Sequence, residues 1–182
     1  MLVRMNFLSA HSEIVRDGLL GGSLSSIWVL LDERRSSRLR LDRKKKVEGR
    51  DAYVLEYSPA GMSDVDIKIY FDAETFRHVR TEYSQTLSAA QGLTPNASVH
   101  QNEARHQLTE DFIEFSEEGG LTLPHLYKLR LTILGAGDTS EFEWRFHLAT
   151  FRFDQALDPT TFVVRDFKNS YIADHCGRLF HI

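Results

Sequence analysis

The fold class of this chain is decided by one alternating stretch: Glu141-Phe142-Glu143-Trp144-Arg145-Phe146-His147-Leu148. Apolar side chains occupy every even position, and charged or imidazole side chains occupy every odd position. Successive side chains of a β-strand point to opposite faces of the sheet. This period of two therefore predicts a strand with one apolar face and one solvated face, as antiparallel sheets allow.

The same period recurs upstream and predicts about eight strands in all. Their main ranges are residues 37–47, 53–57, 65–71, 76–85, 104–116 and 125–133, followed by the stretch above. Short runs of turn residues at 48–51 and 72–75 predict hairpins between consecutive strands. Within 76–85 we expect Val79, Thr81 and Tyr83 to share one face. We expect His78, His106 and His147 to be surface residues.

The N-terminal part of the chain has a helical period instead. One apolar helix face is predicted from four residues: Leu24, Ile27, Trp28 and Leu31. With Ser23 as the N-cap, we expect a helix from Leu24 to Asp32. The predicted fold is mainly β (α+β): a strongly curved antiparallel sheet, or incomplete β-barrel, of about eight strands. The N-terminal helix is expected to cover its concave face.

Length and charge bound the organisation of the chain. Its 182 residues predict a single domain over residues 1–165, followed by a poorly packed tail over 166–182. The net charge of −4 hides a basic stretch, because residues 33–50 carry nine basic and three acidic side chains. This stretch predicts either a solvated strand edge guarded by cations or a contact with an anionic surface or nucleic acid.

No set of residues indicates a catalytic or metal site. A histidine pair with metal-ligand spacing is missing from the sequence, and the one cysteine, Cys176, lies near His175 and His181 in the tail. The acidic group comprises Glu110, Asp111, Glu114, Glu117 and Glu118. We interpret it as a solvated outer face. The sequence thus predicts no enzyme, no catalytic residue, no cofactor and no metal.

A family resemblance rests on six stretches that follow one another along the chain: Gly18–Asp32, Lys46–Tyr53, Ile69–Tyr83, Gly120–His125, Phe142–Trp144 and Leu157–Pro159. They resemble segments of uncharacterised bacterial proteins in the outer-membrane lipoprotein-sorting class, which is similar to the LolA/LolB-like carriers. The resemblance implies a half-barrel that holds acyl chains in the periplasm. Members of this class begin with an export signal and further strands, so the chain is expected to be an N-terminally truncated form.

The expected function is non-enzymatic binding of a lipid or lipoprotein acyl chain in an apolar cavity. The residues expected to line this cavity are Leu24, Ile27, Trp28, Leu31, Tyr127, Leu129, Leu131, Phe142, Trp144 and Phe146. The same apolar stripe also fits a packed core. Transient contact with a membrane or envelope protein is expected, and nucleic acid is not. The alternatives are a module that binds anionic surfaces or nucleic acid through Arg34–Arg50, and a structural interaction domain.

Overall fold

The computed structural model describes residues 19–24, 39–58, 65–87, 104–135, 138–156 and 158. The chain divides into two compact units, residues 1–151 and 152–182, and every strand described below belongs to the first. The predicted boundary at residue 165 and the tail with His175, Cys176 and His181 lie outside the described residues.

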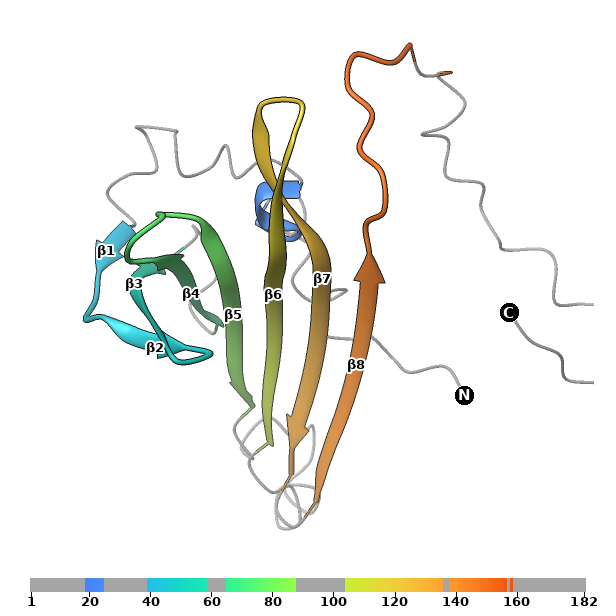
Figure 1. Cartoon of the computed structure of the whole chain (residues 1–182). Helices are drawn as coiled ribbons and strands as arrows, with labels where there is room; N and C mark the ends of the chain where they lie inside the picture. The colour runs from blue at the N-terminus through green and yellow to red at the C-terminus, as the bar shows by residue number, and fades with distance from the viewer. Residues whose placement is uncertain are drawn as a thin grey trace, which may run out of the picture. The chain divides into compact units, whose positions relative to one another are not determined.

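Eight strands form one antiparallel sheet, as the alternating sequence predicts (Figure 1). They are β1 (Leu39–Leu41), β2 (Lys45–Val47), β3 (Arg50–Tyr57), β4 (Val65–Asp72), β5 (His78–Leu87), β6 (Ala104–Glu118), β7 (Leu121–Leu134) and β8 (Thr139–His147). From β3 onward each strand pairs with the next along the chain, while β1 and β2 both pair with β3.

The predicted strong curvature and partial barrel are wrong. The sheet is open and not strongly curled, with β1 and β8 at its ends (Figure 1). Closing a sheet into a barrel requires tilted strands whose edge strands pair with one another in a staggered register. At one end β1 and β2 have three residues each, whereas β8 at the other end has nine.

A bulge in β5 changes which side chains face inward. The register shifts between Tyr70 and Phe71, so that Tyr70 pairs with Arg80 but Phe71 pairs with His78. The extra residue, Val79, packs in a different hydrophobic cluster from Tyr83. The prediction that Val79, Thr81 and Tyr83 share one face is therefore wrong. A bulge inserts one residue into the alternation, so Val79 lies on the other face from Tyr83.

The β4–β5 turn also differs from prediction. Phe76 was expected to begin a strand, but it lies in the turn with a positive φ of 56° and is 68% exposed. Its ring stacks on Tyr53, with the centroids 6.0 Å apart.

The two faces of the sheet differ in composition. One face, here called the apolar face, carries the larger hydrophobic cluster, which includes Tyr57, Ile67, Tyr83, Leu108 and Leu131. The other, here called the ladder face, carries charged rows and a smaller cluster beneath the β2–β3 hairpin: Val47, Ala52, Val54 and Tyr70.

The N-terminal segment lies against the apolar face. It includes the short 3-10 helix η1 (Gly22–Leu24), which contacts β5 and β7. Of the predicted helix 24–32, Leu24 is thus the last residue of a 3-10 turn; Ile27, Trp28 and Leu31 lie outside the described residues. Within the described ranges there is no α-helix, and so none that is long and apolar enough to cross a membrane.

Strands β6 and β7 extend beyond their neighbours. The pairing of β6 with β5 ends at Asp111, and that of β7 with β8 ends at Leu126. Beyond those points Ile113 pairs with Leu126, and residues 115–118 pair with residues 121–124 (Figure 1). Residues 113–118 and 121–124 are here called the β6–β7 ribbon.

Candidate functional site

The structure brings together six of the residues predicted to bind an apolar ligand. They pair directly across β7 and β8: Tyr127 with Phe146, Leu129 with Trp144, and Leu131 with Phe142. Leu129 and Leu131 are buried, whereas Phe142 and Trp144 are partly buried against the same cluster. Phe146 is 45% exposed, so the apolar face becomes accessible towards β8.

A row of rings crosses five strands of the apolar face. It consists of Phe71, His78, Phe112, Tyr127 and Phe146, and is here called the aromatic row. The centroid distances between successive rings are 5.5, 4.6, 5.4 and 5.4 Å. These spacings lie in the range of favourable ring contacts. The row leads from the buried middle of the sheet to the exposed ring of Phe146.

His78 belongs to this row and is buried, contrary to the prediction of a surface residue. Its Nε2 lies 3.0 Å from the carbonyl oxygen of Arg80 and 2.8 Å from Thr81 Oγ1. A carbonyl oxygen accepts only, so we assign the proton to Nε2. Nδ1 is buried and has no hydrogen-bond partner among the residues that the structure describes. Burial lowers the pKa of His78 to about 4, so the ring is neutral at neutral pH.

Glu110 is the second polar side chain of the apolar face, and it is fully buried. Its Oε2 accepts a hydrogen bond from the Tyr83 hydroxyl at 2.7 Å. Its Oε1 accepts two more, from the Tyr127 hydroxyl at 2.6 Å and from the backbone N–H of Gly21 at 2.7 Å. One carboxyl group therefore joins β5, β6, β7 and the N-terminal segment, an arrangement here called the Glu110 clasp.

Burial governs the titration of this clasp. It raises the pKa of Glu110, because a charged carboxylate loses its hydration, although the bonds from Tyr127, Gly21 and Tyr83 partly oppose the rise. Burial and the nearby Glu110 also raise the pKa of Tyr83 and Tyr127. Both tyrosines stay protonated and serve as donors.

The prediction that the acidic group is a solvated face is therefore wrong for Glu110 and Asp111, which are both buried. The period of two contains the signal for Glu110, because it places this residue on the same face as Leu108 and Phe112. Glu114 and Glu117 are exposed.

The segment held by the clasp packs very closely. A Cβ added at Gly22 would lie 2.5 Å from His78 Nδ1 and 2.5 Å from Phe112 Cζ, and Gly22 has a positive φ of 49°. Both observations require glycine. The Gly21-Gly22 pair therefore allows the backbone to lie directly on the aromatic row.

On the opposite face, charged residues form a row across the strands. The cross-strand register joins Arg40, Glu56, Lys68, Glu82, Thr109, Arg130 and Glu143 in that order. The signs alternate except at Thr109, and the row is here called the charge ladder. Glu56 pairs with both Arg40 and Lys68, and Arg130 pairs with Glu143 at 3.0 Å.

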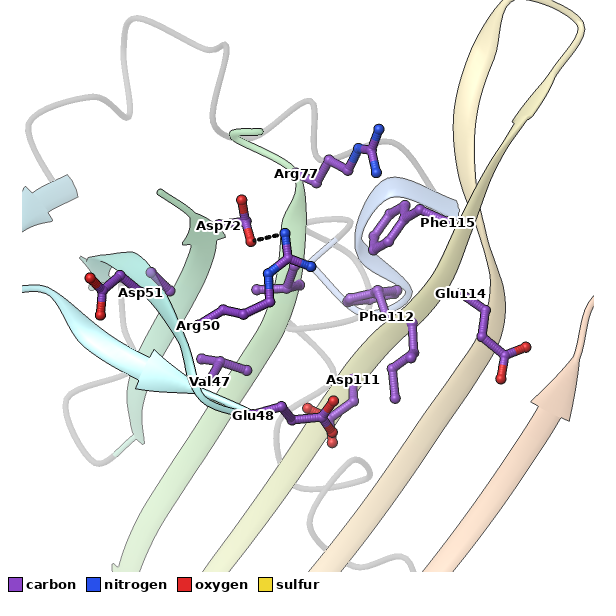
Figure 2. Close-up of a pocket in the computed structure, with 13 residues that line it drawn as sticks. Val47, Glu48, Arg50, Asp51, Asp72, Arg77, Asp111, Phe112, Glu114 and Phe115 are labelled. Atoms are coloured by element: carbon purple, nitrogen blue, oxygen red, sulfur yellow. Dashed lines mark ion pairs between the residues drawn. The ribbon is translucent and has the colours of Figure 1, made fainter. Parts of the chain in front are cut away.

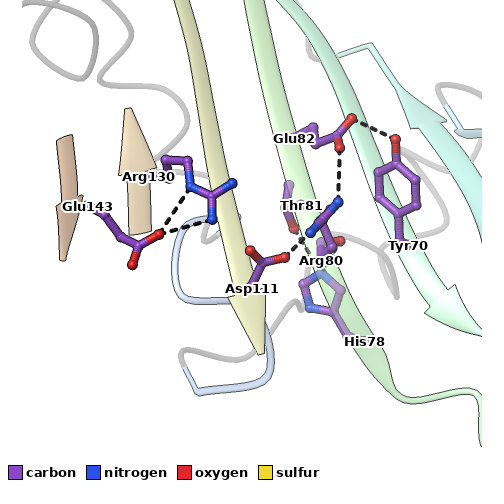
Figure 3. A network of polar contacts seen from close by, with 8 residues as sticks. All are labelled: Tyr70, His78, Arg80, Thr81, Glu82, Asp111, Arg130 and Glu143. Carbon is purple, nitrogen blue, oxygen red and sulfur yellow. Dashed lines mark hydrogen bonds and ion pairs between the residues drawn. The ribbon is translucent and has the colours of Figure 1, made fainter. Parts of the chain in front are cut away.

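Next to the ladder, Arg80 lies between two acids (Figure 3). Arg80 Nε lies 2.6 Å from Oδ1 of the buried Asp111, and Arg80 Nη1 lies 3.7 Å from Glu82 Oε1. Glu82 also accepts a hydrogen bond from the Tyr70 hydroxyl at 2.6 Å, which contributes, after burial, to a raised pKa of Tyr70.

A cleft of about 300 Å³ opens between the β2–β3 hairpin, the β4–β5 turn and β6 (Figure 2). Its two buried carboxylates already have arginine partners: Asp72 pairs with Arg50 at 2.9 Å, and Asp111 pairs with Arg80. Asp72 also accepts hydrogen bonds from the N–H groups of Thr75 and Glu74, which hold the turn. These bonds, that from Thr75 above all, lower the pKa of Asp72. Both buried carboxylates of the cleft are therefore engaged by groups of the same chain.

The described part of the basic stretch, residues 39–50, lies at the β1–β2 end of the sheet. Three of its cations pair with acids of the same sheet: Arg40 with Glu56, Lys46 with Asp51 and Arg50 with Asp72. Lys44 lies over the Tyr53 ring, 4.5 Å from its centroid. Much of the local positive charge is thus compensated within the sheet.

Comparison with known proteins gives no matching family model, no matching curated sequence and no matching solved structure.

Proposed function

We propose that the apolar face around β7 and β8 binds a lipid or lipoprotein acyl chain without catalysis. The observation that carries this proposal is the aromatic row, which ends at the 45%-exposed ring of Phe146 beside Trp144 and Phe142. Partly exposed aromatic side chains in contact with one another offer the apolar surface that an acyl chain needs.

The polar chemistry of this face also supports binding over reaction. His78 and Glu110 are both buried, and their neighbours are groups of the same chain. Their contacts fix strands and the N-terminal segment in place. The face therefore offers an outer ligand mainly apolar contacts.

The resemblance to LolA/LolB-like carriers supports the same proposal and adds a location. A carrier of this kind works in the bacterial periplasm and contacts a membrane or envelope protein when it loads or releases its cargo. The alternative of an anionic-surface module has less support, because Arg40, Lys46 and Arg50 already pair with acids.

The test is binding of a fluorescent fatty acid to the purified full chain, with displacement by unlabelled fatty acid. Phe146→Ser should weaken binding about tenfold, because it removes an exposed ring from the proposed contact surface. Phe76→Ser is the matched control, since Phe76 is also exposed but lies off the row and should leave the affinity unchanged. Equal effects of the two substitutions, or no binding by the native chain, would contradict the proposal.

A further inference from the structure

Strand β8 is the last strand at one edge of the described sheet. In the part of the chain that the structure describes, β8 pairs with β7 alone, and it is nine residues long. Long open edges tend to pair with further strands, and proteins commonly protect them with lysine, proline or a bulge. Residues 139–147 contain neither lysine nor proline, and their register with β7 is regular.

The hydrogen-bond pattern shows which backbone groups this edge offers. Leu148 donates its N–H to the carbonyl oxygen of His125 at 2.8 Å. Hydrogen-bonded and non-hydrogen-bonded pairs alternate along an antiparallel ladder. Even-numbered residues of β8 therefore direct their backbone groups towards β7. The open edge presents those of Glu141, Glu143, Arg145 and His147.

The sequence of this edge is complementary to its own reverse. When two copies of β8 run antiparallel with Trp144 opposite Trp144, each remaining residue of 141–147 meets a suitable partner. Glu143 lies opposite the partner's Arg145, Phe142 opposite the partner's Phe146, and Glu141 opposite the partner's His147. Opposite charges and aromatic pairs in direct cross-strand positions are stabilising.

Each neighbouring register places two like charges directly opposite one another. Pairing centred on Glu143 places that carboxylate opposite its own copy, and pairing centred on Arg145 does the same with two guanidinium groups. Like charges in directly opposite positions are destabilising. Both registers would use the same open backbone groups, so the side chains select the register centred on Trp144.

The two rows described above continue across such a junction. The charge ladder ends with Arg130 and Glu143 and would next meet the partner's Arg145, which keeps the signs alternating. The aromatic row ends at Phe146 and would next meet the partner's Phe142. Because antiparallel pairing keeps paired side chains on one face, the apolar faces of both copies would be continuous.

We propose that the chain forms a two-fold symmetric dimer in which the β8 strands of two copies pair antiparallel around Trp144. The symmetry is of the isologous kind, with the same patch on both subunits. This dimer does not require acyl-chain binding, although Phe142, Trp144 and Phe146 belong to both proposed surfaces.

The first test is the mass of the full chain by light scattering coupled to size-exclusion chromatography. Twice the chain mass at micromolar concentration is expected, and a monomer at every concentration would overturn the proposal. Arg145→Glu should weaken dimerisation at least tenfold, because two carboxylates then face each other at both symmetric positions. Arg43→Glu makes the same charge change at an exposed site of the opposite end and should leave dimerisation unchanged.

Disulfide cross-linking tests the register and uses a Cys176→Ser background with an added thiol oxidant. Trp144→Cys should give a covalent dimer, because Cβ atoms of directly opposite residues lie about 4.5–5.5 Å apart. Phe142→Cys and Phe146→Cys should not cross-link alone but should form a mixed dimer when combined. Cross-linking of Glu143→Cys with itself in preference to Trp144→Cys would overturn the proposed register.

Discussion

On the apolar face, Glu110 and His78 are buried among rings and held by a few hydrogen bonds. On the ladder face, charged residues form partly exposed ion pairs with their cross-strand neighbours. A buried polar group costs free energy unless it is bonded, so each bond of the first kind matters individually. Exposed ion pairs are screened by water and contribute little singly. The comparison teaches that a small number of buried groups should dominate the stability of this sheet.

Removal of the Glu110 carboxyl tests this comparison most strongly. Glu110→Ala leaves the hydroxyls of Tyr83 and Tyr127 and the N–H of Gly21 without their acceptor. We expect a loss of about 3–5 kcal/mol in the free energy of unfolding, measured by urea denaturation. Glu110→Gln keeps one acceptor oxygen and should lose less. A loss for Glu110→Ala as small as that of a surface substitution would contradict the comparison.

Acidification tests the second buried group. The folded pKa of His78, about 4, lies below its ordinary value of 6.5, so the unfolded chain takes up this proton first. The stability that neutral His78 contributes is present above pH 6.5 and is lost as the pH falls towards 4, by about 3 kcal/mol in total. The free energy of unfolding of the native chain should therefore fall by about this amount relative to that of His78→Phe over this range, as measured by urea denaturation at each pH. The raised pKa of Glu110 acts in the opposite direction, but it is present in both proteins and cancels in their difference.

Two buried tyrosines of the apolar face provide a matched pair. The Tyr83 hydroxyl donates to Glu110, whereas the Tyr57 hydroxyl is buried and finds no hydrogen-bond partner within the described ranges. Tyr83→Phe should lower the free energy of unfolding by about 1–2 kcal/mol, while Tyr57→Phe should leave it unchanged or raise it. Thermal denaturation of the two variants side by side measures this contrast. Equal losses would mean that ring packing, and not the bond to Glu110, determines the cost.

The ladder face should give the smallest effect. Lys68 Nζ lies 3.4 Å from Glu56 Oε1, and the Lys68 side chain is partly exposed. Lys68→Ala should cost less than about 1 kcal/mol, and the cost should fall as salt is added, because exposed ion pairs are screened. Urea denaturation at low and high salt measures both quantities. A loss comparable to that of Glu110→Ala would show that the ladder acts as one strongly coupled network.

The sequence predicted the faces of most strands but not how the strands align. Alternation placed Ile67, Leu129 and Trp144 correctly, because a period of two depends only on local order. The bulge at Val79 of β5 has no sequence signal of this kind, so His78 was predicted on the wrong face of the sheet. The predicted curvature was also wrong. The alternating pattern does not show that β1 and β2 have only three residues each, because the lengths of these edge strands depend on tertiary contacts.

The candidate site shows the same division. Six of its residues, on β7 and β8, were predicted as a group, since one hairpin contains them all. The aromatic row and the Glu110 clasp were missed, because both connect strands far apart in the sequence. The clasp joins residue 110 to Gly21, 89 positions away, and only the register of the whole sheet brings them together.

The β6–β7 ribbon has a consequence for the motions of the molecule. Its residues 113, 115–118 and 121–124 pair with one strand each, and Glu114 between them has a positive φ of 57°. A two-stranded ribbon is marginally stable alone, so its backbone amides should exchange with deuterium through local opening that leaves the rest of the sheet folded. Because Ile113, Glu114 and Phe115 line the cleft, each such opening would also widen it. The cleft and the Glu110 clasp therefore belong to parts of the sheet with different local stabilities, although their residues are neighbours on one strand.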